Sequence, residues 1–360
     1  MGRALPRTAA ERTLCRAEVQ QDPHNRHFAP RHATLFFVAR DRARCQKPMK
    51  HSATLVLPLI ALIFNACALT SHDVKTSTFG TPHRSADLVA VIDLPGPISV
   101  ETVTACDWAV DRGGLINLKH PKAIAAKLAD GDEPIQIYFH ALRHPQRGLF
   151  LIDTGVEKLL RDKPDDAAIQ GLVAHFMHVE KMKNFIPLGD WLAKQPDKLN
   201  GVFLTHMHID HVSGVPDVPK GTAIYSGPGE TTATEFTNLF MKGNINRELE
   251  GQLPIEELPF KPDEDKRFAG LLDIFGDGSL WAIWVPGHTP GSMAFIARTP
   301  QGSILFTGDT SHTKWGWDNG VEPGKFTGDQ EGNAKSLMQL KALAAEHPAM
   351  DVRLGHQKLR

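Results

Sequence analysis

Three histidines and one aspartate lie within six residues of this 360-residue chain, in the motif HMHIDH at residues 206–211. The apolar run 201–204 comes directly before the motif, so the motif should form a loop at the end of a strand. Imidazoles and carboxylates cannot all pack in a core, because each would need a buried polar partner. A strand-end loop can instead turn His206 and His208 towards one metal ion, and Asp210 and His211 towards a second. The alternative is a histidine cluster on the protein surface.

Three further residues of ligand type follow short apolar runs later in the chain. They are His288 in VPGHTPGS, Asp309 at the end of LFTGD, and His356 at the end of VRLGH. Each alone would more often be structural, but together with the 206–211 motif they complete two sites. Neutral imidazoles and carboxylates suit Zn²⁺, which we expect first, and also Mn²⁺, Fe²⁺ or Co²⁺. The four cysteines have no CxxC spacing, which argues against a thiolate zinc site.

Short apolar runs that end in turn residues predict seven strands. They are expected at residues 136–140, 149–153, 201–205, 280–285, 293–298, 304–307 and 351–354. The run 280–285 is apolar on both faces, as expected for a strand covered on both sides. Helical periodicity is clear at 334–347 and weaker at 166–182. Strands mixed with helices predict a layered α/β domain, with residues 226–278 as an insertion that could form a lid.

The first 85 residues are predicted to contain targeting and linker segments rather than part of the folded domain. Residues 1–48 have ten Lys and Arg against four Asp and Glu and no sustained periodicity, so we expect an upstream extension, disordered or not translated. Residues 49–66 have the basic start, short apolar run and small-residue exit of a secretory signal peptide. This signal predicts an exported, periplasmic protein. The sequence FNAC around Cys67 resembles a bacterial lipobox, so the exported protein is expected either to carry a lipid anchor at Cys67 or to be released without one. Residues 67–85 are expected to be a polar linker.

The charge of the remaining chain constrains its partners. Residues 67–360 carry 29 Lys and Arg against 37 Asp and Glu. Nucleic-acid binding needs a concentrated cationic surface, so this acidic body argues against a nucleic-acid partner. The expected partner is a small molecule, and membrane contact is expected only if Cys67 carries the lipid anchor.

The order of the motifs LIDTG (residues 151–155), HMHIDH, PGHTPGS, TGD and a late GH resembles the metallo-β-lactamase superfamily over residues 86–360. The resemblance implies a single αββα four-layer sandwich with a dinuclear metal site at one edge of its sheets. It assigns the first metal to His206, His208 and His288. It assigns the second metal to Asp210, His211 and His356. Asp309 would bridge the two metals, and Asp153 would support the ligands from beneath.

Residue types at the ligand positions separate the branches of this superfamily. In flavodiiron oxygen reductases a glutamate occupies the position of His208, and in true β-lactamases a cysteine or serine occupies the position of Asp309. The residues of this chain therefore argue against both branches. Glyoxalase II enzymes continue into a helical thioester-binding region, whereas this chain stops four residues after His356. The remaining resemblance is to N-acyl homoserine lactonases and to relatives that cleave esters or organophosphate triesters.

The expected function is therefore an exported hydrolase that opens lactones or cleaves carboxylic esters through a hydroxide shared by two metals. Phosphotriester, phosphodiester or aryl-ester hydrolysis at the same site is the alternative, and a non-catalytic metal-binding lipoprotein is the other class. Asp210 is a candidate proton shuttle as well as a ligand. His312 stands where these lactonases carry a tyrosine that binds the substrate carbonyl, so it is a candidate catalytic residue, unless it faces solvent. Trp315, Trp317 and Phe326 are candidate pocket residues, unless they pack the sandwich edge.

Overall fold

The computed structural model describes residues 68–234 and 238–358. The chain divides into two units, Met1–Ser52 and Ala53–Arg360, and the described residues all belong to the second. The predicted upstream extension, signal peptide and anchor at Cys67 lie outside the described residues. Within the described ranges, every helix is too short or too polar to cross a lipid bilayer.

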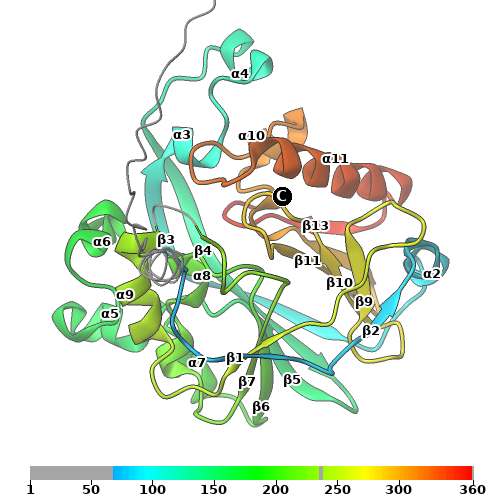
Figure 1. Cartoon of the computed structure of the whole chain (residues 1–360), viewed down its shortest axis with the longest axis horizontal. Helices are drawn as coiled ribbons and strands as arrows, with labels where there is room; N and C mark the ends of the chain where they lie inside the picture. The colour runs from blue at the N-terminus through cyan, green and yellow to red at the C-terminus, as the bar shows by residue number, and fades with distance from the viewer. Residues whose placement is uncertain (1–67, 235–237, 359–360) are drawn as a thin grey trace, which may run out of the picture. The chain divides into compact units, whose positions relative to one another are not determined.

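Two β-sheets face each other in this unit (Figure 1). The seven-stranded sheet has the order β1 (Val74–Thr76), β8 (Ile255–Glu257), β7 (Ala223–Ser226), β6 (Leu199–Phe203), β5 (Gly148–Ile152), β4 (Asp132–His144) and β3 (Ser99–Asp111). The six-stranded sheet has the order β13 (Asp351–Arg353), β12 (Gly302–Phe306), β11 (Met293–Thr299), β10 (Leu280–Trp284), β9 (Gly270–Asp273) and β2 (Thr81–His83). All seven strands expected from the sequence are present.

Alternation along the strands divides the apolar side chains between an inner and two outer layers. In β6, Phe203 joins the cluster between the sheets, whereas Val202 joins the cluster on the outer face of the seven-stranded sheet. In β10, Ala282 faces inward, and Trp281 and Ile283 face the outer cluster of the other sheet. Successive side chains of a strand point to opposite faces, so strands this apolar require cover on both sides.

Helices supply that cover. Over the seven-stranded sheet lie α5 (Lys158–Asp162), α6 (Gly171–Phe176), α7 (Leu188–Leu192), α8 (Ile209–Val212) and α9 (Asn238–Glu248). Over the six-stranded sheet lie α2 (Ser85–Val91), α10 (Lys314–Asn319) and α11 (Gln330–Glu346). The predicted αββα sandwich is confirmed, and the helix expected at 334–347 is the greater part of α11.

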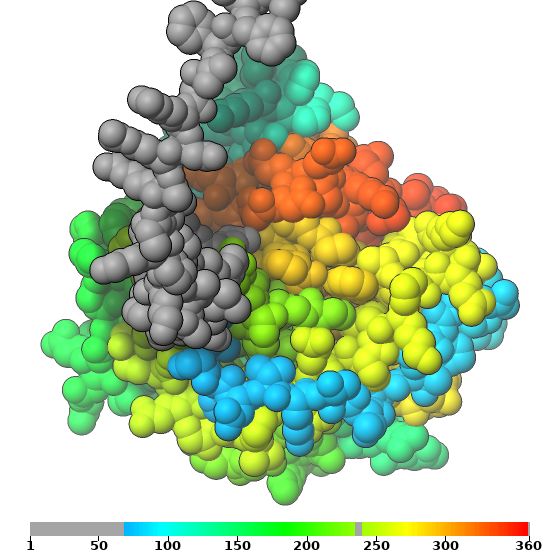
Figure 2. Space-filling model, in the orientation of Figure 1, coloured from blue at the N-terminus to red at the C-terminus, as the bar shows by residue number. Residues whose placement is uncertain are grey.

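Three expectations about individual segments were wrong. The linker expected at 67–85 instead pairs its backbone into both sheets as β1 and β2, and runs over the surface between them (blue in Figures 1 and 2). The polar side chains of this segment predicted a linker, but strands pair through backbone hydrogen bonds and do not require apolar side chains at a sheet edge. The segment 226–278 supplies α9, β8 and β9 and is therefore part of the layers rather than a lid. The helix expected at 166–182 is reduced to α6, since His178 adopts a left-handed φ of 51°.

Two glutamates are buried beneath the helices on the seven-stranded sheet. Glu157, at the N-terminus of α5, accepts a hydrogen bond from Ala168 N–H at 2.6 Å, and burial raises its pKa to about 7. Glu248, at the end of α9, is fully buried, and burial and the charge of Glu157 raise its pKa well above the ordinary value. The carboxylate of Asp217 also faces this pair, opposed by the cation of Arg247.

We expect the variant Glu157→Gln to melt at a higher temperature than the wild type above pH 8, and at the same temperature below pH 4. The folded wild type binds more protons than the unfolded chain between the ordinary pKa of 4.5 and about 7, so its unfolding free energy falls as pH rises through that range. Glutamine keeps the acceptor for Ala168 and has no charge to lose. Thermal unfolding with a metal chelator at several pH values measures the difference.

The matched control is Glu331→Gln, which changes an exposed glutamate at the start of α11. It should leave the melting temperature close to that of the wild type at every pH. A pH-independent difference for Glu157→Gln would show that Glu157 does not titrate in the folded protein.

Candidate metal centre

The candidate site lies where the carboxyl ends of strands from both sheets meet. β5 runs parallel to β6, and β12 runs parallel to β13. β10 has the direction of β12, because both pair antiparallel with β11. The loops after these strands carry Asp153, the 206–211 motif, His288, Asp309 and His356. Met293 N–H donates to the Thr205 carbonyl at 2.7 Å and joins the two sheets at this edge.

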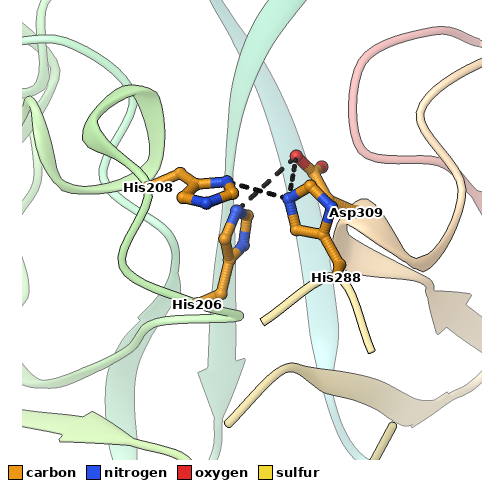
Figure 3. Close-up of side chains that lie close together, drawn as sticks. All are labelled: His206, His208, His288 and Asp309. Carbon is orange, nitrogen blue, oxygen red and sulfur yellow. Dashed lines mark hydrogen bonds and ion pairs between the residues drawn. The ribbon is translucent and has the colours of Figure 1, made fainter. Parts of the chain in front are cut away.

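The first cluster consists of His206, His208, His288 and Asp309, whose ligand atoms lie within 4.8 Å of one another. Figure 3 shows the three imidazoles turned towards a common point beside the Asp309 carboxylate. His208 Nδ1 lies 2.8 Å from His288 Nε2. Asp309 Oδ2 lies 3.6 Å from His206 Nε2 and 3.5 Å from His288 Nε2. Three nitrogens and one oxygen therefore converge on a single small volume.

The second cluster consists of Asp210, His211, His356 and the same Asp309. Asp309 Oδ2 lies 3.3 Å from the Nε2 atoms of both His211 and His356. Asp210 Oδ2 lies 3.2 Å from His356 Nε2 and is the most exposed group of this cluster, with 14 % of its side chain accessible. Asp309 thus belongs to both clusters, as the bridging position requires.

Groups outside the clusters fix the orientation of these imidazoles. Asp153 adopts a φ of 57°, which is tolerated better by aspartate than by most residues, and its Oδ2 lies 2.8 Å from His211 Nδ1. The Gln136 carbonyl accepts from His356 Nδ1 at 2.9 Å. Thr327 Oγ1 lies 3.1 Å from His288 Nδ1. Metal-binding histidines characteristically hold their second nitrogen in this way, which turns Nε2 into the site.

The electrostatics differ between the two clusters. In the first, burial lowers the pKa of His206 and His288 well below 6.5 and that of His208 to about 4, so these imidazoles are neutral. In the second, burial opposes the charged form of His356, but Asp309 and Asp210 raise its pKa to about 10. The same carboxylates, with Asp153, raise the pKa of His211. Without a cation this cluster holds protons, which a bound cation would displace.

The donor set fits divalent metal ions. His206 Nε2 and His211 Nε2 are buried and have no hydrogen-bond partner, and both face Asp309 Oδ2. Buried polar atoms are nearly always paired, so unpaired donor atoms converging on one point indicate a place for a ligand. Neutral imidazoles with carboxylates are the donors that zinc and related cations prefer. The two clusters are therefore a site for two metal ions that share Asp309.

Glu230 joins the two histidine loops of the first cluster, although no sequence pattern predicted a role for it. Its fully buried carboxylate accepts from Met207 N–H at 2.7 Å, between His206 and His208. The same carboxylate accepts from Thr289 Oγ1 at 2.7 Å and from Gly291 N–H at 3.0 Å, beside His288. Glu230 stands alone in a stretch of Gly, Thr and Ser, where no motif marks it.

His312 is buried against Asp309, so it does not face solvent. Trp317 packs in the outer cluster of the six-stranded sheet, with Lys341 Nζ 5.0 Å from its ring. Trp315 is half-buried against the outer cluster of the other sheet. Phe326 is 44 % exposed and lies over Gly114, in the connection between β3 and β4.

The family model for the metallo-beta-lactamase superfamily matches residues 135–356, more than half of the chain. The protein belongs to the metallo-β-lactamase superfamily. Both His and Asp clusters lie within the residues that the family model matches.

Among curated proteins, the chain is 29 % identical over 167 residues to an N-acyl homoserine lactonase, AttM, of Azorhizobium caulinodans, covering 46 % of this chain and 60 % of the relative. It is 25 % identical to the protein of the same name from Rhizobium johnstonii, over 62 % of this chain and 83 % of the relative. The match thus spans less than two thirds of the first of these relatives.

Solved structures share the fold at low sequence identity. A quorum-quenching N-acyl homoserine lactone hydrolase superimposes with a TM-score of 0.52 at 17 % identity, over 73 % of this chain and 93 % of the other. A probable metal-dependent hydrolase from Staphylococcus aureus gives a TM-score of 0.53 at 13 % identity, over 73 % and 90 %. These similarities agree with the αββα architecture.

We expect Glu230→Gln to weaken metal binding at the first cluster by about tenfold to a hundredfold, the range typical of residues that orient ligands. Glutamine turns an NH₂ group towards donors that need an acceptor, which loosens the two loops against each other. Competition for Zn²⁺ with a chromophoric chelator measures the affinity.

Glu346→Gln is the control, since Glu346 forms a surface ion pair with Arg267. It should bind both ions as the wild type does. Unchanged Zn²⁺ affinity in Glu230→Gln would mean that Glu230 stabilises the loops without positioning the ligands.

Proposed function

We propose that the protein is a dinuclear hydrolase that opens lactones or cleaves carboxylic esters. The observation that carries the proposal is the shared carboxylate of Asp309. Its Oδ2 lies within 3.6 Å of nitrogens from both clusters, so two cations bound there would be neighbours across one carboxylate. We assign His206, His208 and His288 to one cation, and Asp210, His211 and His356 to the other.

Two divalent cations so bound would supply a water of lowered pKa as nucleophile and an electrophile for the substrate carbonyl. The chain's own groups orient and protonate. Asp153 holds the proton of His211 on Nδ1 and so keeps Nε2 as a donor. Asp210, the most accessible carboxylate of its cluster, can take a proton at Oδ2 from the attacking water and return it to the leaving alkoxide.

The choice of substrate is supported by the relatives. The two curated relatives described above are named N-acyl homoserine lactonases. The resemblance of the sequence motifs to that group includes an aspartate at the position of Asp309. The same ligands would also serve a phosphotriester, phosphodiester or aryl ester, because two metals stabilise either kind of developing oxyanion. Substrate profiles therefore decide between these classes. We further propose zinc as the metal, with manganese, iron(II) or cobalt as the alternatives.

The test measures proton release by the full chain, loaded with Zn²⁺ or with Mn²⁺, in weakly buffered solution. The substrates are N-butanoyl and N-decanoyl homoserine lactone, 4-nitrophenyl acetate and a diethyl aryl phosphate. Lactone opening yields a carboxylic acid and releases one proton per turnover near neutral pH. We expect turnover on the lactones, and a loss of more than about a hundredfold in Asp309→Ala, which removes the group shared by both clusters. Metal analysis should show the second ion lost as well.

Asp351→Ala, which changes an exposed aspartate at the start of β13, should keep full turnover. Full turnover with two metals in Asp309→Ala would refute the assignment of the site. Faster hydrolysis of the phosphate triester than of any lactone would move the proposal to that class. Two bound metals with no turnover on any substrate would favour a non-catalytic metal-binding protein.

A further inference from the structure

His312 lies against the shared carboxylate, closer than any other imidazole. Its Nε2 is 2.9 Å from Asp309 Oδ2, whereas the four other Nε2 atoms around that oxygen lie at 3.3 to 3.6 Å. The His312 ring centre is 5.0 Å from that of His288 and 5.4 Å from that of His356, so it stands between the two clusters. The side chain is 2 % exposed. It therefore belongs to the buried site rather than to its rim.

The second ring nitrogen of His312 determines what the first can do. Nδ1 lies 3.2 Å from the backbone carbonyl of Leu115, at the end of α3 (Arg112–Leu115). A carbonyl oxygen only accepts hydrogen bonds, so Nδ1 carries the proton. In neutral His312 the lone pair is then on Nε2 and points at Asp309 Oδ2. Nε2 is thus the nitrogen that His312 offers to the site, and it lies 2.9 Å from the carboxylate oxygen of the residue that both clusters share.

His312 shares this arrangement with the histidines assigned as ligands. His356 Nδ1 is held by the Gln136 carbonyl, and His211 Nδ1 by the Asp153 carboxylate, each with Nε2 turned to Asp309. The backbone also fastens His312 to the ligand loop, because its carbonyl accepts from His356 N–H at 3.1 Å. The Leu115 carbonyl thus serves His312 as the Gln136 carbonyl serves His356.

We infer that His312 is a further metal ligand of the dinuclear site, binding through Nε2 with its tautomer fixed by the Leu115 carbonyl. This inference rests on the metal site of the proposed function but not on any substrate. It differs from the role expected from the sequence, in which His312 binds the substrate carbonyl, since that role requires Nε2 to leave Asp309. If His312 is a ligand, the connection between β3 and β4 helps to orient it, because Leu115 lies in that connection.

The test uses the full chain with ¹⁵N-labelled histidine, loaded with ¹¹³Cd²⁺ as the probe. Scalar coupling between cadmium and an imidazole nitrogen reports ligation directly. We expect six coupled imidazoles in the wild type: those of His206, His208, His211, His288, His312 and His356. In His312→Phe we expect five, together with a loss of about tenfold or more in the affinity for one of the two Zn²⁺ ions, measured by chelator competition.

His347→Phe is the control, because His347 is another buried histidine held through Nδ1, here by Asp93 at 2.9 Å. It should keep all six couplings and both affinities. His312→Gln provides a second variant in case phenylalanine disturbs folding, which circular dichroism will show, and it should lose the same coupling. Five couplings in the wild type, with Zn²⁺ affinities unchanged in both His312 variants, would overturn the inference while leaving the proposed function intact. A wild type that binds fewer than two ions would instead contradict the metal site itself.

Discussion

The rest of the site depends on one buried carboxylate, that of Asp309. Five imidazole nitrogens lie within 3.6 Å of its Oδ2, and they come from four different loops. Burial raises the pKa of a carboxyl, but the surrounding imidazoles hold the pKa of Asp309 well below its ordinary value. The ionised form of Asp309 is therefore stable in the protein interior because the imidazoles surround it. Packing around Asp309 is correspondingly tight, since a Cβ on Gly355 would lie 2.1 Å from its Oδ1.

The sandwich makes this concentration of polar groups possible. The charged and polar loops all leave the same edge of two sheets whose faces are apolar, so burial of those faces supplies the stability that the edge lacks. Hydrogen bonds then fix the loops to one another across the two sheets. Glu230 holds the 206–211 loop against the loop of His288, and Asp153 holds Thr205 and His211 against the end of β5. The loops at this edge are thus held together by two carboxylates, Asp153 and Glu230, each of which accepts several hydrogen bonds.

The sequence predicted the fold class and the cluster-forming residues because both leave periodic or local signals. Strands β5, β6, β10 and β12 are apolar runs that end in motif residues, and the motif HMHIDH is short enough to read directly. Edge strands β1 and β2 were missed, because their pairing depends on backbone groups and their side chains are polar. β3 was missed although Val103, Trp108 and Val110 are buried, since a bulge near Thr104 interrupts its alternation.

Residues that orient the ligands were harder to find than the ligands. Asp153 lies in a recognisable LIDTG turn, whereas Glu230 and the carbonyls of Gln136 and Leu115 act through contacts that only the folded chain creates. A backbone carbonyl has no signature in a sequence, because every residue possesses one. His312 illustrates the consequence, since its position in the motif suggests a substrate partner and its hydrogen bond to Leu115 suggests a ligand. Which nitrogen of a histidine faces a site is decided by the partner of the other nitrogen, so assigning that histidine requires the fold and not the motif alone.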